Sequence, residues 1–150
     1  MDELDHNILT LLERNGRLSH EEIGKLLHIS RPSVHQRVAK LEKSGIIKGY
    51  RGLIDWSRLD QKIKVVISVK VVSRYFQEVA DKIVEMEIPG VTLMECLRMA
   101  GEWCMMLKVR VGSPEQITLL IDEIVKIPEV KETSTTFVLS TIYEDGLKGM

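Results

Sequence analysis

The chain has 150 residues, of which 44% are hydrophobic, and its formal net charge at pH 7 is −1. This length can form one domain or two small ones, and the hydrophobic content is ordinary for a packed core. The sequence has no run of about 18 apolar residues, and its first ten residues, MDELDHNILT, carry acids where a signal peptide would carry lysines. We therefore expect a cytoplasmic protein without a membrane partner.

The charge is unevenly distributed along the chain. Residues 1–29 carry three Lys or Arg and six Asp or Glu (net −3), residues 30–55 carry six and two (+4), and residues 56–150 carry twelve and fourteen (−2). A localised basic patch on a nearly neutral chain fits a surface that meets a phosphate backbone. Most charge runs, however, are solvated helix faces, so charge alone leaves both interpretations open.

Two helices are predicted before the basic patch. Apolar residues recur at helical spacing ahead of the helix stop Asn15-Gly16, and they are Leu4, Ile8, Leu11 and Leu12. Ser19 and Glu22 form an S-x-x-E capping box, which predicts a second helix from about His20 to Leu27. We assign Asp2 and Asp5 as first-turn acids that favour the dipole of the first helix.

A third helix is predicted from about Arg31 to Ser44, after a turn at His28 and Ile29. Ser30 is a suitable N-cap and Gly45 a suitable stop, while an apolar stripe of Val34, Val38 and Leu41 faces inward. The outward residues are of types that bond base edges and phosphates. Three short helices with this outward face predict a helix-turn-helix that binds double-stranded DNA, with candidate contacts at Arg31, Ser33, His35, Gln36, Arg37 and Lys40.

The residues after Gly45 have the character of a strand. Ile46, Tyr50 and Leu53 are its apolar members, and glycines permit bends, so we expect a wing or a hinge strand. Residues 56–62 read as a polar connector. We therefore expect a DNA-binding domain at residues 1–55, a linker at 56–62 and a second domain at 63–150.

The second part contains a weak internal repeat. IVEMEIPGV at residues 83–91 and IVKIPEV at residues 124–130 share a helix end, an Ile-Pro and a Val that opens a strand. The pattern predicts strands and helices in the ferredoxin-like βαββαβ order, which makes the whole chain an α+β protein. The predicted elements are a strand at 63–72, a helix at 76–86, strands at 91–99 and 103–111, a helix at 114–126 and a strand at 130–142, followed by a frayed tail at 144–150.

The predicted sheet has apolar residues on both faces. In the first strand one face carries Ile63, Val65, Ile67, Val69 and Val71, and the alternate face still carries Val66 and Val72. In the third strand Trp103 is assigned to the face of Met105 and Leu107, with Cys104 and Met106 on the other. Exposed apolar surface of this kind marks an interface. We therefore expect face-to-face pairing of sheets in a homodimer, which would also supply two reading helices to paired half-sites.

The chain resembles the Lrp/AsnC family of transcription regulators along its whole length. The resemblance rests on residues 4–50, which include the family's S-x-x-x-V-x-x-R-V-x-x-L-E-x-x-G-x-I helix, and on CLRMAGEWCMMLKV at residues 96–109. It implies a nucleoid-associated, sequence-specific DNA-binding regulator with an effector-binding and oligomerisation domain. It also implies dimers that assemble into octamers or similar rings, and modulation by an amino acid or related metabolite.

The resemblance places the effector site at the hairpin between the second and third strands, with contacts at Met99, Ala100, Gly101, Glu102, Trp103 and Cys104. Family members commonly read G-D-Y-D where Gly101-Glu102-Trp103-Cys104 stands here. A thiol is a poor substitute for an acid that binds an ammonium group. Either Glu102 takes over that role, or the effector is not a standard α-amino acid, or the protein is an effector-independent architectural factor that wraps DNA.

Enzymatic function finds little support in the sequence. The histidines, His6, His20, His28 and His35, all lie in the first part without H-x-x-x-H spacing, and Cys96 and Cys104 lack C-x-x-C spacing, so we expect buried thiols, no metal and no cofactor. Siroheme decarboxylases share this two-domain arrangement, but their substrate's carboxylates would need Arg and His in the second part. Residues 56–150 contain no histidine, and we expect that the protein is not an enzyme.

Overall fold

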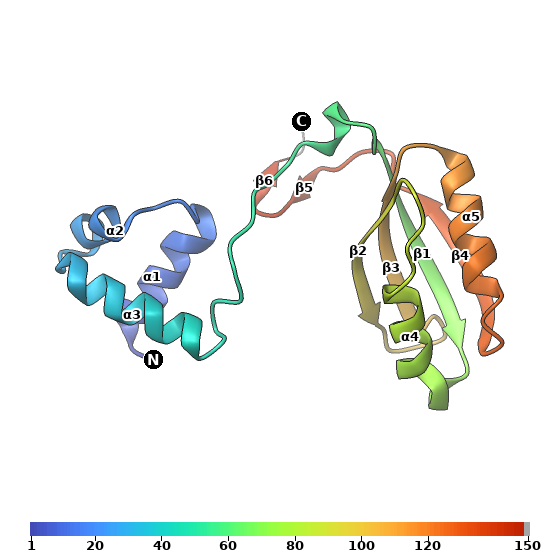
Figure 1. Ribbon diagram of the computed structural model, residues 1–150, viewed down its shortest axis with the longest axis horizontal. Helices are drawn as coiled ribbons and strands as arrows, with labels where there is room; N and C mark the ends of the chain where they lie inside the picture. Colours follow the sequence, from blue (N-terminus) through green and yellow to red (C-terminus); the bar gives the residue numbers. More distant parts are fainter. Residues whose placement is uncertain (149–150) are drawn as a thin grey trace. The chain divides into compact units, whose positions relative to one another are not determined.

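The computed structural model describes residues 1–148 and divides the chain into two compact units, Met1–Leu53 and Ile54–Met150 (Figure 1). The residues expected at the end of the tail, 149 and 150, lie outside the described part. Within that part, none of the helices has the length and apolar character needed to cross a membrane.

The first unit contains the three predicted helices: α1 (Glu3–Arg14), α2 (His20–Leu27) and α3 (Arg31–Lys43). Their starts follow from side-chain capping. The Ser19 hydroxyl accepts the Glu22 N–H at 3.2 Å and the Glu22 carboxylate accepts the Ser19 N–H at 2.7 Å, which confirms the predicted capping box. The helices bury one core, which includes the predicted stripe of α3 and consists of Ile8, Ile23, Val34, Val38 and Leu41.

The turn between α2 and α3 is held very close to α2. His28 caps α2 in the left-handed conformation, with φ of 56°, and Ile29 donates its backbone N–H to the Gly24 carbonyl at 3.0 Å. A Cβ atom placed on Gly24 would lie 2.7 Å from the carbonyl oxygen of Ile29. Gly24 thus permits the close approach that sets the angle between the two helices, a constraint that the sequence pattern did not reveal.

The strand expected at residues 46–53 is not formed by the single chain. These residues are irregular, because Gly45 and Gly49 adopt positive φ angles of 72° and 153° and break the extended conformation. Instead the segment folds back onto α3: Ile47 packs against the core and the Tyr50 hydroxyl donates to Glu42 Oε1 at 3.0 Å. The expectation of a wing or hinge strand was therefore wrong for an isolated chain.

The second unit confirms the ferredoxin-like order. Its sheet is arranged β2-β3-β1-β4 with antiparallel neighbours, and the two helices cover one face (Figure 1). Each helix follows the amphipathic pattern that predicted it. The elements are β1 (Ile63–Val71), α4 (Phe76–Val84), β2 (Val91–Arg98), β3 (Met105–Val111), α5 (Pro114–Val125) and β4 (Val130–Phe137), with short 3-10 turns at Trp56–Arg58 (η1) and Ser73–Tyr75 (η2).

The predicted inward face of the sheet is the core of this unit. Val65, Ile67 and Val69 of β1 are fully buried, and so are their counterparts in β3, which are Met105, Leu107, Val109 and Val111. The last strand is shorter than expected and ends at Phe137. After it the chain leaves the sheet with its apolar side chains exposed, Leu139 by 97% and Ile142 by 77%.

The tail expected to fray forms a small hairpin instead, β5 (Tyr143–Glu144) and β6 (Leu147–Lys148). Asp145 and Gly146 make its turn with positive φ angles of 50° and 81°, as a two-residue hairpin requires. Glu144 ties the hairpin to the open face of the sheet, because its carboxylate pairs with Lys64 and Lys108, each at 2.6 Å. That face is thus more polar than the strand alternation predicted.

The segment expected to be a polar linker is anchored to the second unit. The guanidinium of Arg110, 8% exposed, lies 3.8 Å from the centre of the Trp56 ring, and its Nε donates to Gln61 Oε1 at 3.1 Å. Gln61 in turn donates to the Gly90 carbonyl at 3.0 Å and accepts from the Thr92 hydroxyl at 2.9 Å. Residues 56–61 therefore belong structurally to the second unit, beside the ends of β2 and β3.

We expect Gly24→Ala to lower the free energy of unfolding of the first unit by about 1–3 kcal/mol, because the added methyl group collides with the Ile29 carbonyl. Alanine alone would favour the helix by about 1 kcal/mol, so the clash determines the sign. Chemical denaturation followed by far-ultraviolet circular dichroism measures the change. Gly52→Ala is the matched control, since no described neighbour lies within 4 Å of its added carbon; equal midpoints for the two variants would contradict the prediction.

Candidate nucleic-acid interface and effector site

The outward face of α3 carries the predicted DNA-contacting residues. Ser33, Gln36 and Lys40 follow at spacings of three and four, which places them on one side of the helix, and Arg31 stands in its first turn. Gln36, Lys40 and Arg31 are exposed, whereas Ser33 is half-buried. The structure thus presents a long amide and a cation on the side opposite the buried stripe, with a second cation, Arg31, at the start of the helix, a combination suited to base edges and phosphates.

His35 lies at the edge of this face. It is exposed, and its ring centre is 5.3 Å from that of His20 on α2, with the planes tilted by 54°. Sequence reasoning identified His35 but not this neighbour, because the contact depends on the angle between α2 and α3 rather than on spacing within one helix. The contact between His20 and His35 continues the polar edge of α3 onto α2.

Arg37 is a predicted contact that forms ion pairs inside the first unit. Its Nη1 donates to both carboxylate oxygens of Asp2, each at 2.8 Å, and to Asp5 Oδ1 at 2.7 Å. Asp2 and Asp5 also form a reciprocal capping box at the start of α1. They are therefore more than first-turn acids that favour the helix dipole, because they connect the start of α1 to the middle of α3.

The same contacts keep both acids ionised. The pKa of Asp2 is lowered, first by the backbone N–H of Asp5 and then by the Arg37 guanidinium, and the pKa of Asp5 is lowered by the backbone N–H of Asp2 and by Arg37. Since each folded pKa lies below its ordinary value of 3.8, the resulting stabilisation is present at neutral pH and is lost as the pH falls through the folded pKa values. The connection is therefore complete throughout the physiological range.

The candidate effector residues form the loop between β2 and β3. Met99 donates its N–H to the Cys104 carbonyl at 2.8 Å, which closes the loop, and Gly101 at its tip has a φ of 111°, a conformation that favours glycine. Met99, Ala100, Gly101 and Glu102 are exposed, while Trp103 and Cys104 are half-buried. The six residues thus lie together at one end of the sheet.

The side chains of Trp103 and Cys104 lie opposite to the predicted alternation. Cys104 packs against the core, and its Sγ accepts the backbone N–H of Val71 at 3.3 Å. The Trp103 ring instead lies beside Lys70, an outward-facing residue of β1. The alternation failed because β3 begins only at Met105, so the period of two does not extend into the loop. Both cysteines are only partly buried, not fully buried as expected.

Lys70 is the centre of a charged cluster at this loop. Its Nζ lies 2.5 Å from Glu102 Oε1, 2.7 Å from Glu132 Oε2 and 4.4 Å from the centre of the Trp103 ring. The hydrogen bonds that Lys70 donates to Glu102 and then to Glu132 raise its pKa, so the ammonium form is favoured. The sequence could not reveal this cluster because its members come from β1, the loop and β4.

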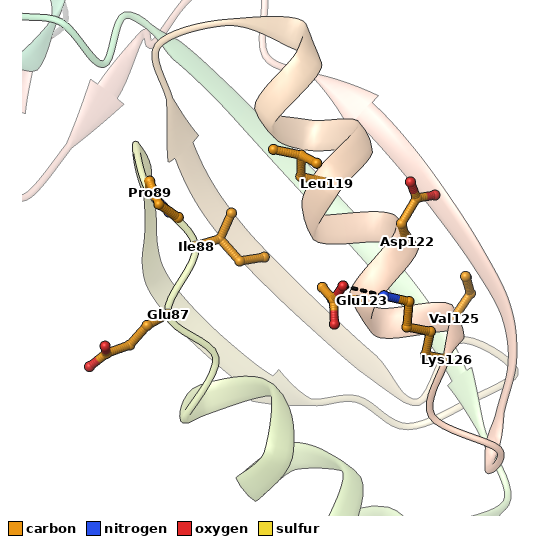
Figure 2. A pocket seen from close by; sticks show the side chains of 8 residues that line it. All are labelled: Glu87, Ile88, Pro89, Leu119, Asp122, Glu123, Val125 and Lys126. Atoms are coloured by element: carbon orange, nitrogen blue, oxygen red, sulfur yellow. Dashed lines mark hydrogen bonds and ion pairs between the residues drawn. The ribbon is translucent and has the colours of Figure 1, made fainter.

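A separate open groove lies between α5 and the loop that precedes β2 (Figure 2). Its apolar members include Leu119 and Val125 on α5 and Pro89 on the loop, and Lys126 pairs with Glu123 at its edge. None of the predicted effector residues lines it. The groove has few convergent polar groups, and it is a poor candidate for the site of a small polar ligand.

Within residues 1–148, no group of three or more His, Cys, Asp or Glu is arranged to hold a metal ion. The candidate sites that the sequence predicted are the face of α3 and the loop at Gly101.

Comparison with protein families agrees with this two-part organisation. Residues 1–42 match the AsnC-type helix-turn-helix domain, and residues 64–147 match the Lrp/AsnC ligand binding domain. The chain is 30% identical to the HTH-type transcriptional regulator FL11 of Pyrococcus abyssi, over 94% of this chain and 91% of the relative. It is 32% identical to the HTH-type transcriptional regulator LrpC of Bacillus subtilis, over 95% of this chain and 94% of the relative.

Solved structures show the same architecture. The structure of B. subtilis LrpC is similar with a TM-score of 0.80 at 30% identity, covering 95% of this chain and 97% of that one. E. coli AsnC gives a TM-score of 0.82 at 25% identity, covering 96% and 95%. A Neisseria meningitidis regulator, NMB0573, solved as an L-Met complex, has the same fold, with a TM-score of 0.85 at 22% identity over 96% and 93%. The chain therefore belongs to the Lrp/AsnC family of DNA-binding transcriptional regulators with a ligand-binding domain.

Proposed function

We propose that the protein regulates transcription by binding a specific site in double-stranded DNA through the exposed face of α3. The observation that carries this proposal is the placement of Gln36 and Lys40 on one exposed side, with Arg31 at the start of the helix. Ser33 and His35 flank this side and complete the contact surface. Binding to DNA would place the protein at the nucleoid.

Within this proposal Arg37 contributes mainly by positioning α3. Its guanidinium is engaged by Asp2 and Asp5, so its charge is largely compensated before DNA arrives. The two carboxylates hold the middle of the reading helix against the start of α1. A helix fixed in this way presents its outward residues in one orientation, which specific recognition of a base sequence requires.

We further propose that a small metabolite, of the amino-acid class, modulates the protein through the loop at Gly101. The family's ligand-binding domain and the L-Met complex of the Neisseria regulator support the class of ligand. The inward orientation of Cys104 leaves Glu102 as the acid of the loop, which supports the interpretation that Glu102 takes over the role of the missing acid. The effector-independent architectural function is the second candidate, because Lys70 already compensates Glu102.

We also propose that the protein is a homodimer and that dimers assemble further, up to an octamer. The support comes from residues 137–143, where Phe137, Leu139, Ile142 and Tyr143 are exposed by 50%, 97%, 77% and 67%. Side chains of this size gathered in one short segment are typical of surfaces that a second subunit covers.

The proposed function is tested by titrating the purified protein against DNA from upstream of its own gene, over a salt series, with and without pools of amino acids. We expect binding in the nanomolar range that weakens steeply with salt, because phosphate contacts release counterions. We also expect one of the amino-acid pools to change the DNA affinity. A DNA affinity that none of the pools changes would support the architectural function. Absence of binding would contradict DNA recognition through α3.

We expect Arg37→Ala to weaken DNA binding by about 1–3 kcal/mol, because α3 loses its attachment to α1. The double variant Asp2→Asn with Asp5→Asn retains good capping residues but loses the charges that hold Arg37, and we expect it to weaken binding as well. Binding titrations at fixed salt measure both effects. Lys40→Ala is the comparison: it should weaken binding and lower the salt slope by about 1 without changing the melting temperature.

Unchanged binding by Arg37→Ala would contradict any role of Arg37 in DNA recognition. Tighter binding by the double aspartate variant would instead show that the released guanidinium contacts DNA directly, which is the direct contact that the sequence predicted.

Light scattering at micromolar concentration should give a mass of at least twice the 17.1 kDa of one chain. We expect the paired substitutions Leu139→Asp and Ile142→Asp to reduce that mass, because they place charges in the proposed interface. Leu119→Asp is the matched control, since Leu119 is 54% exposed on α5, away from residues 137–143. A monomeric wild-type protein would contradict the proposal.

A further inference from the structure

The ammonium group of Lys70 occupies a position built from three different elements. Lys70 faces Glu132 directly across the β1–β4 pair, while Glu102 and Trp103 reach it from the loop after β2. The register of β1 against β4 shifts between Lys70 and Val71, and bulges of this kind re-aim side chains. The Lys70 side chain is only 21% exposed, whereas that of Glu102 is 74% exposed, so the surrounding groups cover the cation.

The partners of Lys70 have the chemistry that recognises an ammonium ion. Two carboxylates lie within 2.7 Å of Nζ, and the face of an indole ring, the best cation–π acceptor among side chains, lies 4.4 Å away. Lys64 and Lys108 offer a contrast in the same sheet: they share the carboxylate of Glu144, and Lys108 also lies 3.8 Å from Glu95 Oε1. Among these three lysines, and within the described residues, only Lys70 has the face of an aromatic ring beside its carboxylate partners.

An amine or amino-acid ligand at the loop would need the same three groups. Because the Cys104 side chain faces the core, Glu102 is the acidic residue of the loop, and Trp103 is its aromatic residue. Both already contact the Lys70 ammonium. A ligand's ammonium group can therefore bind there only after Lys70 has left the cluster.

We infer that Lys70 is a specificity-determining residue of the effector loop, whose own ammonium group occupies the position in which Glu102, Glu132 and Trp103 would receive the ammonium group of an amine or amino acid. The inference rests on the proposed effector role of this loop. It means that the wild-type loop rejects simple amines, and that removal of the Lys70 side chain creates a site for them.

The test is chemical complementation of Lys70→Ala in the full chain. The probe is n-propylammonium chloride, which replaces the missing end of the lysine side chain; n-propanol is its uncharged counterpart, and potassium chloride matches the ionic strength. We expect n-propylammonium to raise the melting temperature of Lys70→Ala saturably by mass action. We expect at least tenfold weaker binding to the wild type and no saturable effect of n-propanol or potassium chloride.

Two further variants identify the site. Lys64→Ala removes a lysine of the same strand that also pairs with a carboxylate, and it should not respond to n-propylammonium. Adding Trp103→Leu to Lys70→Ala should abolish the response. If Lys70→Ala folds poorly, Lys70→Met retains the full length of the aliphatic stem and lacks only the nitrogen, and the ammonium ion is then the probe.

Equal responses of wild type and Lys70→Ala, or no response of Lys70→Ala and Lys70→Met, would overturn the inference. The measurement is independent of DNA. If Lys70→Ala binds n-propylammonium but its DNA affinity does not change with the ligand, the ammonium position is confirmed and the effector role of the loop is contradicted. Failure of the wild type to bind DNA contradicts only the proposed function.

Discussion

The hydrogen bonding of β1 to strands on both of its sides is the constraint on which the functional groups of the second unit depend. Val65, Ile67 and Val69 are fully buried beneath the helices, so a register shift of one residue would expose the whole inward set. The same alternation fixes Lys64 and Lys70 on the opposite face, toward opposite ends of the strand. Lys64 receives Glu144 of the tail hairpin, and Lys70 receives Glu102 and Glu132. A packing requirement thereby positions both charged clusters.

The first unit obtains its order from contacts among its own helices. Gly24 lets the turn approach α2, and Arg37 fastens α3 to the start of α1 through two acids whose pKa values are lowered. Because these pKa values are lowered, the ion pairs do not titrate near neutral pH, and they hold α3 in the same way over the neutral pH range. The covalent connection from this unit to the ligand-binding domain runs through Trp56 and Gln61, which Arg110 holds at the ends of β2 and β3.

Periodicity and capping predicted the fold well because both depend on neighbouring residues. The three helices of the first unit, the βαββαβ order and the inward faces of β1 and β3 were all predicted from the sequence. The errors lie where a strand starts late or does not form, or where a long-range contact overrides a local pattern. Trp103 and Cys104 reversed their faces because the strand starts later, and the tail became ordered because Glu144 finds two lysines far away in sequence. The Arg37 and Lys70 clusters each join at least two elements, so spacing within one element could not reveal either.

Cys104 stands where the common loop pattern of the family has an acid, and the contacts of Lys70 show a physical consequence of this difference. Cys104 satisfies a backbone N–H of β1 and leaves Glu102 as the loop's carboxylate, but that carboxylate is compensated by a tethered cation. The Glu102 side chain is 74% exposed, so rupture of its ion pair with Lys70 costs little. A tethered group nevertheless has an effective concentration in the millimolar range, and a free amine must exceed it. A ligand at the proposed effector site would then displace Lys70 only by making further contacts of its own, so the loop would select for the rest of the ligand rather than for its ammonium group.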